Sequence, residues 1–94
     1  MIRFVELVGD SAHQRSFALG EVWINDKYVV KIKEATGYSQ MLKEGLLPPD
    51  LDTHHEFTAV TVNNGSLTET HVVIGSVPFV ASRLSGDRKT LLKG

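Results

Sequence analysis

The sequence predicts one small α+β domain, mainly β. We expect an antiparallel five-stranded meander, curled or barrel-like, with one C-terminal helix and a short helix in the 38–55 insertion. Three observations favour this class. Five segments are rich in β-branched and aromatic residues, which suit a half-buried sheet. An Asn-Gly pair separates the last two segments, and a capped amphipathic pattern follows them. A length of 94 residues fits a single domain, residues 1–94.

The last two segments form the clearest local signal. Phe57–Asn63 and Leu67–Ile74 are rich in Val, Thr, Ile and Phe. Between them, Asn64-Gly65 offers the two positive-φ positions of a two-residue hairpin turn. The sequence therefore predicts a tight β-hairpin here.

A helix is expected immediately after this hairpin. Gly75 ends the strand, Ser76 suits an N-cap, and Pro78 falls in the first turn, where its missing N–H costs nothing. Gly86 is placed to end the helix. One apolar face follows at helical spacing, formed by Val77, Val80, Ala81 and Leu84.

Three earlier strands are expected at Ile2–Val8, Phe17–Ile24 and Lys27–Ala35. Trp23, flanked by Val22 and Ile24, is expected in the core or in an interface. In the third strand, alternation predicts that Val30 and Ile32 share the buried side, opposite Lys31 and Lys33.

Both faces of the predicted hairpin carry apolar residues, so both faces need a cover. We expect the C-terminal helix on one face and a barrel curl or a second subunit on the other. Alternation divides the apolar residues into one set of Val60, Val62, Leu67 and Val73 and a second set of Phe57, Ala59, Val72 and Ile74.

The 38–55 insertion is predicted to begin with a short helix over Tyr38–Gly45, with Ser39 as N-cap and Gly45 as its end. Pro48 and Pro49 then exclude a regular element. Two interpretations stay open: a lid whose leucines cover the end of the sheet, or a partner-binding loop. The candidate partner-binding residues are Tyr38, Leu46, Leu47 and Leu51.

Composition excludes several classes of protein. The absence of cysteine excludes disulfides, thiol catalysis and Cys-based zinc sites. A net charge of −1 argues against a nucleic-acid binder. No window approaches the roughly 20 apolar residues of a membrane span, and the start lacks the pattern of a signal peptide. We therefore expect a cytoplasmic protein without a membrane segment, and a homo-oligomer that adds burial to a small core.

Charge is unevenly distributed along the chain. Residues 48–75 carry four acidic and no basic side chains, whereas residues 76–94 carry four basic side chains and one acidic one. Two interpretations stay open: a solvated tail near its own acidic loop, or a charged rim for a neighbouring subunit or an anionic ligand.

Signals for catalysis or metal binding are weak. His54 and His55, near Asp50, Asp52 and Glu56, form the densest group of candidate metal ligands, with His71 or His13 as further ones. Adjacent residues in an extended segment point opposite ways, which disfavours a shared ion. No nucleophile elbow, metalloprotease motif or phosphate-binding loop occurs. We predict no metal, no cofactor and no enzymatic activity.

The strongest candidate site is the strand-to-helix junction at Gly75-Ser76-Val77. A helix N-terminus exposes N–H groups that suit an anion, although Ser76 as a cap can satisfy them itself. Basic residues follow, and aromatic residues could stack a base if an oligomer brings them near. The candidate ligand-binding set is Gly75, Ser76, Val77, Arg83, Arg88, Lys89, Trp23 and Tyr28.

The order of a strand ending in Asn, a V-x-x-I strand, an Asn-Gly hairpin and a Val-rich helix resembles small flagellar FlbD-type proteins and short bacterial and phage proteins of that pattern. The resemblance covers about two-thirds of the chain. It departs at Pro78 and at the Tyr38–His55 insertion, and it implies a fold without any catalytic residue. The matching positions are Val22, Ile24, Asn25, Val29, Ile32, Asn64, Gly65, Ser76, Val77, Val80 and Leu84.

Three functions follow in order of preference. The first is a non-enzymatic, homo-oligomeric, phage-type binding protein that sequesters a small anionic, nucleotide-like ligand at the strand-to-helix junction and a subunit interface. The alternative is a protein-interaction module, a small regulator or inhibitor, that uses the 38–55 loop. The third is a metal-dependent enzyme that uses the histidines.

Overall fold

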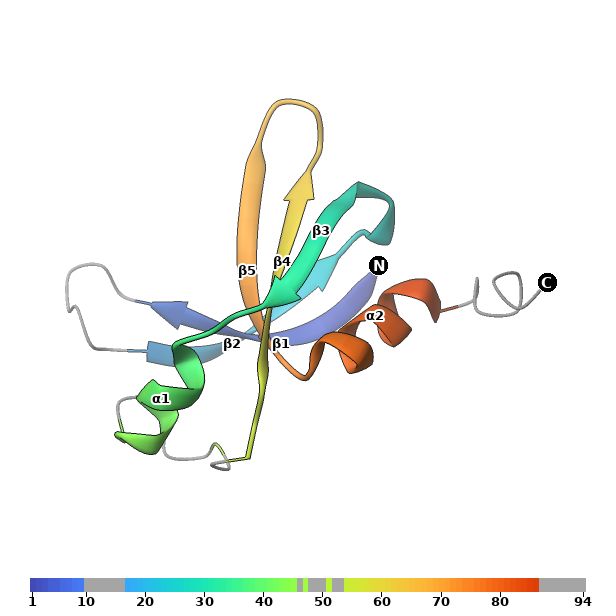
Figure 1. The fold of residues 1–94 in the computed structure, drawn as a ribbon. Helices are drawn as coiled ribbons and strands as arrows, with labels where there is room; N and C mark the ends of the chain where they lie inside the picture. The colour runs from blue at the N-terminus through green and yellow to red at the C-terminus, as the bar shows by residue number, and fades with distance from the viewer. Residues whose placement is uncertain (10–16, 46, 48–50, 52–53, 87–94) are drawn as a thin grey trace.

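The computed structural model of the chain describes residues 1–9, 17–45, 47, 51 and 54–86. Its strands form one antiparallel sheet, which confirms the prediction of a mainly β fold with five strands (Figure 1). In chain order the elements are β1 (Ile2–Gly9), β2 (Phe17–Ile24), the 3-10 helix η1 (Asp26–Tyr28), β3 (Val29–Glu34), α1 (Tyr38–Lys43), β4 (Phe57–Asn63), β5 (Thr68–Ile74) and α2 (Val77–Ser85).

The strand order is β2-β1-β5-β4-β3, so the prediction of a meander is wrong: β2 and β3 follow each other in the chain but do not pair, and β1 pairs with β5 instead. β1 and β2 pair along their whole length, as do β4 and β5. These two ladders are joined only where Glu6 of β1 lies opposite Val73 of β5. In Figure 1, β3, β4 and β5 rise together while β1 and β2 cross their base. Among the described residues the sheet is not closed into a barrel, because its two outer strands, β2 and β3, do not pair with each other.

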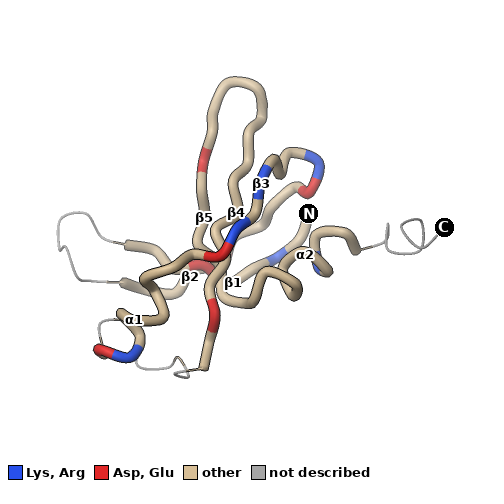
Figure 2. The backbone as a smooth tube through the Cα atoms, viewed as in Figure 1, with Lys and Arg blue, Asp and Glu red and all other residues tan. Residues whose placement is uncertain are grey.

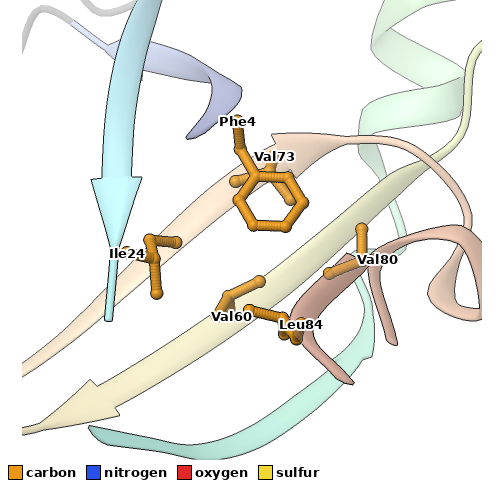
Figure 3. Close-up of a cluster of buried hydrophobic side chains, with 6 residues drawn as sticks. All are labelled: Phe4, Ile24, Val60, Val73, Val80 and Leu84. Atoms are coloured by element: carbon orange, nitrogen blue, oxygen red, sulfur yellow. The ribbon is translucent and has the colours of Figure 1, made fainter. Parts of the chain in front are cut away.

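One hydrophobic core, the α2 core, lies between the sheet and α2 (Figure 3). Val60 of β4, Val73 of β5 and Val80 of α2 are fully buried in it. Burial of such side chains contributes roughly 1.5–3 kcal/mol each relative to exposure. The buried members are Phe4, Ile24, Val60, Val73, Val80 and Leu84.

A second core, the α1 core, lies on the other face of the hairpin. Val72 and Ile74 pack in it, whereas Val73 between them packs in the α2 core, as the two-residue period of a strand requires. Its buried members are Leu7, Leu42, Leu47 and Phe57. Both faces of the hairpin are therefore covered by this chain itself, the second by α1 and its neighbours rather than by a barrel curl.

The β4–β5 turn differs from the two-residue turn that the sequence predicts. The strands end at Asn63 and resume at Thr68, so the loop has four residues. Gly65 alone in it has positive φ, at 101°. The Asn64 side chain accepts hydrogen bonds from the N–H groups of Ser66 and Leu67, at 3.4 and 3.2 Å. Asn64 thus acts through its side chain instead of adopting left-handed backbone.

The prediction for Val30 is wrong. The register shifts between Val29, which pairs with Val62, and Lys31, which pairs with Thr61. Val30 is the extra residue of this bulge and is 63% exposed. A bulge reverses the alternation of side chains, so Val29 joins Ile32 against the α2 core.

The two helices begin differently. α1 follows Gly37, at φ 96°, so its N-cap is Gly37 rather than Ser39, and its C-cap is Glu44 rather than Gly45. α2 has Ser76 as N-cap, whose hydroxyl oxygen accepts a hydrogen bond from the Phe79 N–H at 3.2 Å. Gly86 follows the last turn at φ 28°.

The junction between β5 and α2 depends on Gly75. Its φ of 136° lies where L side chains are strained, and an added Cβ would stand 2.5 Å from Cδ2 of Phe79. Its N–H donates to the Glu56 carbonyl and its carbonyl accepts from the Thr58 hydroxyl, both at 2.8 Å. These contacts fix the direction in which α2 leaves the sheet.

We expect Gly75→Ala to lower the free energy of unfolding by roughly 3 kcal/mol, because backbone strain and a steric overlap with Phe79 add together. Gly65→Ala is the matched control: its φ is also positive, but an added Cβ meets nothing within 4 Å. It should cost about 1 kcal/mol, from strain alone. Urea denaturation measures both, and equal losses would contradict the steric argument.

Candidate functional site

The helix N-terminus at Gly75-Ser76-Val77 offers few donors to an anion. Of the first three helical residues, Pro78 has no N–H and the N–H of Phe79 is taken by the Ser76 hydroxyl. Val77 alone can present its N–H. The cap therefore satisfies most of what an anion would have bound.

Arg83, two turns later, is held by three contacts. Its guanidinium carbon lies 5.4 Å from the ring centre of Phe4 and 5.9 Å from that of Phe79, within the range of cation–π attraction. Its Nη2 donates to the carbonyl oxygen of Arg3 at 3.1 Å. β1 and α2 lie side by side here, and Figure 2 shows basic residues on both. The guanidinium has five N–H donors, so several remain for another acceptor.

Arg83 lines a groove of about 340 Å³ between β1, β2, α2 and the segment around His55. We call it the arginine groove. Among the described residues that line it, the charged and titratable ones are Arg3, His55 and Arg83, and none is a carboxylate. Phe79 and Leu19 expose 49% and 38% of their surface. The described residues of its lining are Arg3, Phe4, Val5, Leu19, Leu51, His55, Ile74, Phe79 and Arg83.

Of the residues that line this groove, Arg83 belongs to the ligand-binding set predicted from the sequence, whereas Arg3, His55 and Phe79 do not. Arg3 and Arg83 are 80 positions apart, and no local pattern connects them. Arg3 also pairs with Glu21 of β2, Nη1 to Oε2, at 2.7 Å. Because both side chains are half exposed, this ion pair contributes little to stability and leaves Arg3 able to meet a ligand.

The aromatic residues of the predicted set lie elsewhere. Trp23 and Tyr28 line a second groove of about 340 Å³, which we call the tryptophan groove, beside the β4–β5 hairpin. Trp23 is 55% exposed, so it is not a core residue. The lining comprises Met1, Val22, Trp23, Ile24, Asn25, Tyr28, Val62, Asn64, Leu67, Glu69 and His71. The structure thus does not bring Trp23 and Tyr28 into the groove that Arg83 lines.

The candidate partner-binding residues serve the core of this chain. Leu47 is 6% exposed, and Leu51 and Tyr38 pack with it in the α1 core. The Tyr38 ring lies 6.3 Å from that of Phe17 and 6.0 Å from that of Phe57. These side chains cover the sheet, as in the lid interpretation. Leu46, Arg88 and Lys89 lie outside the described residues.

His71 links the two halves of the sheet. Its Nδ1 lies 2.9 Å from Oε1 of Glu6 and its Nε2 lies 3.2 Å from Oε1 of Glu69. Glu6 is also the residue of β1 that pairs with β5. The contact therefore reinforces the single point at which the two ladders join, across 65 positions that no local pattern connects.

Within the described ranges, no group of three or more His, Asp or Glu residues is arranged to hold a metal ion. Asp50, Asp52 and His13, which the metal hypothesis used, lie outside these ranges. In the same part of the chain, no helix has both the length and the apolar character needed to cross a bilayer.

A comparison with protein-family models gives no match, and neither curated proteins nor solved structures give a significant one. The resemblance to FlbD-type and short phage proteins therefore stays a prediction.

We expect His71→Leu to lower the free energy of unfolding by about 1–2 kcal/mol, because it leaves the part-buried Glu6 carboxylate without its hydrogen-bond partner. The side chains of His71 and Glu6 are only 21% and 18% exposed. Glu69→Ala, which removes the more exposed contact, should cost less than about 0.5 kcal/mol. Thermal or urea unfolding checks both values, and the reverse order would contradict the assigned role of Glu6.

Proposed function

We propose that the chain is a non-enzymatic, homo-oligomeric binding protein that holds a small anionic, nucleotide-like ligand in the arginine groove. The observation that carries the proposal is the composition of the described lining of that groove: apolar walls, with two arginines, Arg3 and Arg83, and His55 as the polar groups among the residues that the structure describes. A concave, largely apolar site with a few convergent polar groups is the usual form of a small-molecule site.

Each part of the groove has a matching part of the ligand. The guanidinium of Arg83 is planar and partly fixed by Phe4, Phe79 and the Arg3 carbonyl, so less freedom is lost when it binds an oxyanion. The exposed parts of Phe79 and Leu19 supply a surface for an apolar or aromatic part. The proposed site therefore lies along the side of α2, and not at the helix N-terminus that the sequence predicted.

The same lining supports a binding role over catalysis. The described lining residues include no Ser, Thr, Asp or Glu, so among them no hydroxyl nucleophile and no carboxylate base stands beside His55. Binding and sequestration of an anion need only the arginines and the apolar walls that the groove provides. The alternative of an interaction module loses support, because Leu47 is buried and Leu51 packs in the core of the chain.

The test uses AMP as an anionic probe and adenosine as the neutral probe with the same base, with calorimetry as the measurement. We expect AMP to bind more tightly than adenosine. We expect Arg83→Met, which keeps much of the side-chain stem over the rings, to lower the affinity for AMP at least tenfold, since a charge-assisted contact is lost.

Lys33→Met on β3 is the matched control. It removes an exposed positive charge that is not part of the arginine groove, and it should leave the affinity for AMP within twofold of the parent. Equal losses from both variants would mean that AMP responds only to overall charge. The absence of any charge-dependent binding in the parent protein would refute the proposal for this ligand class.

A further inference from the structure

The outer edge of β2 lacks a partner strand in the part of the chain that the structure describes. β2 has eight residues, pairs regularly with β1 on one side, and has no partner strand on the other among the described residues. An edge of this length presents a row of free N–H and C=O groups and can act as a template for another strand. Lys, Arg and Pro are absent from it, and Glu21, its one charged residue, pairs with Arg3.

The direction of the free groups follows from the ladder. The Arg3 carbonyl meets Arg83, so it points away from β2. In a regular antiparallel ladder, backbone direction alternates along each strand. Even-numbered residues of β1 and β2 therefore bond to each other, and the outward groups of β2 belong to its odd-numbered residues, Phe17, Leu19, Glu21 and Trp23.

The opposite edge of the sheet is guarded. β3 has six residues, carries a bulge at Val30, and exposes Lys31 and Lys33. Basic residues mark this strand in Figure 2. Bulges and edge lysines are the devices by which proteins prevent strand addition. The contrast between the two edges indicates that β2 alone is available for pairing.

We propose that β2 pairs antiparallel with β2 of a second copy of this chain, about a two-fold axis near Gly20, to form one continuous sheet. A strand edge that pairs with itself in this way is self-complementary, as a two-fold interface requires. With Gly20 on the axis, Leu19 lies opposite Glu21 of the partner, whereas centring on Glu21 would oppose two carboxylates. In the same register the exposed Trp23 lies opposite Phe17 of the second copy and gains an aromatic neighbour.

This inference rests on the proposed function only in its homo-oligomeric part, and it names the interface. Leu19 also lines the arginine groove, and Arg3 in that groove contacts Glu21. Pairing through β2 therefore places the grooves of the two copies near the same axis. The ligand itself is not needed for the pairing.

The first test is native mass spectrometry, with light scattering at tens of micromolar chain. We expect a dimer for the parent protein. Glu21→Pro removes one outward N–H while leaving the bonds of the even-numbered residues to β1, and it should give a monomer. Glu21→Ala is the matched control: it loses the contact with Arg3 but keeps the N–H, and it should stay dimeric. A monomeric parent, or a Glu21→Pro variant as dimeric as Glu21→Ala, would overturn the proposal.

The second test holds even if Glu21→Pro fails to fold. The chain has no cysteine, so a Leu19→Cys, Glu21→Cys double variant places its thiols only on the outer edge of β2. Hydrogen-bonded partners in a sheet lie about 5.5 Å apart at Cα, a distance that a disulfide spans. We expect a covalent dimer on mild oxidation. A Lys31→Cys, Lys33→Cys control on β3 should stay monomeric on a denaturing gel, and equal cross-linking of the two variants would refute the assignment to β2.

The AMP titration is run separately on Glu21→Ala and Glu21→Pro. Failure to bind AMP in a protein that remains dimeric would refute the ligand proposal and leave the interface standing. Binding of AMP by a monomeric parent protein would do the reverse.

Discussion

The fold depends on covering both faces of the β4–β5 hairpin with one short chain. Val60 and Val73 face one side while Phe57, Val72 and Ile74 face the other, so neither face can be left to water. α2 covers the first face and α1, with Leu47 and Leu51, covers the second. Neither helix covers Trp23 of β2, which stays 55% exposed.

The arginine groove arises from the way in which β5 ends. β1 continues past the single β1–β5 pair at Glu6 and Val73, whereas the chain turns at Gly75 into α2 soon after Val73. The Arg3 carbonyl on this side of β1 has no strand beside it, and Arg83 from α2 supplies the missing donor. A structural hydrogen bond therefore also fixes a cationic group beside a hollow. The hydrogen bond from Arg83 to the Arg3 carbonyl thus both holds α2 beside β1 and places a positive charge in the groove.

Local chemistry was sufficient to predict the strands and the β5–α2 junction from the sequence, because residue preference, the cap at Ser76 and the breaks at Gly75 and Gly86 each act within a few positions. It failed where tertiary contact decides. Val30 is turned outward by a bulge, and Asn64 uses its side chain in a longer loop. The groove was beyond prediction for the same reason, since its two arginines meet only through the packing of α2 beside β1.

The groove and the free edge share residues, and this has a thermodynamic consequence. Leu19 presents its backbone to the edge and its side chain to the groove, and Glu21 at the edge contacts Arg3 in the groove. A strand that pairs with β2 would restrict the motion of Leu19 and Glu21. A ligand that binds in the groove afterwards would then lose less conformational entropy in fixing these residues. Coupling of this kind is reciprocal. The factor by which pairing through β2 raises the affinity for the ligand equals the factor by which the ligand raises the affinity between the two copies. A second copy paired at β2 would in this way add to the rigidity that the core of a single chain supplies.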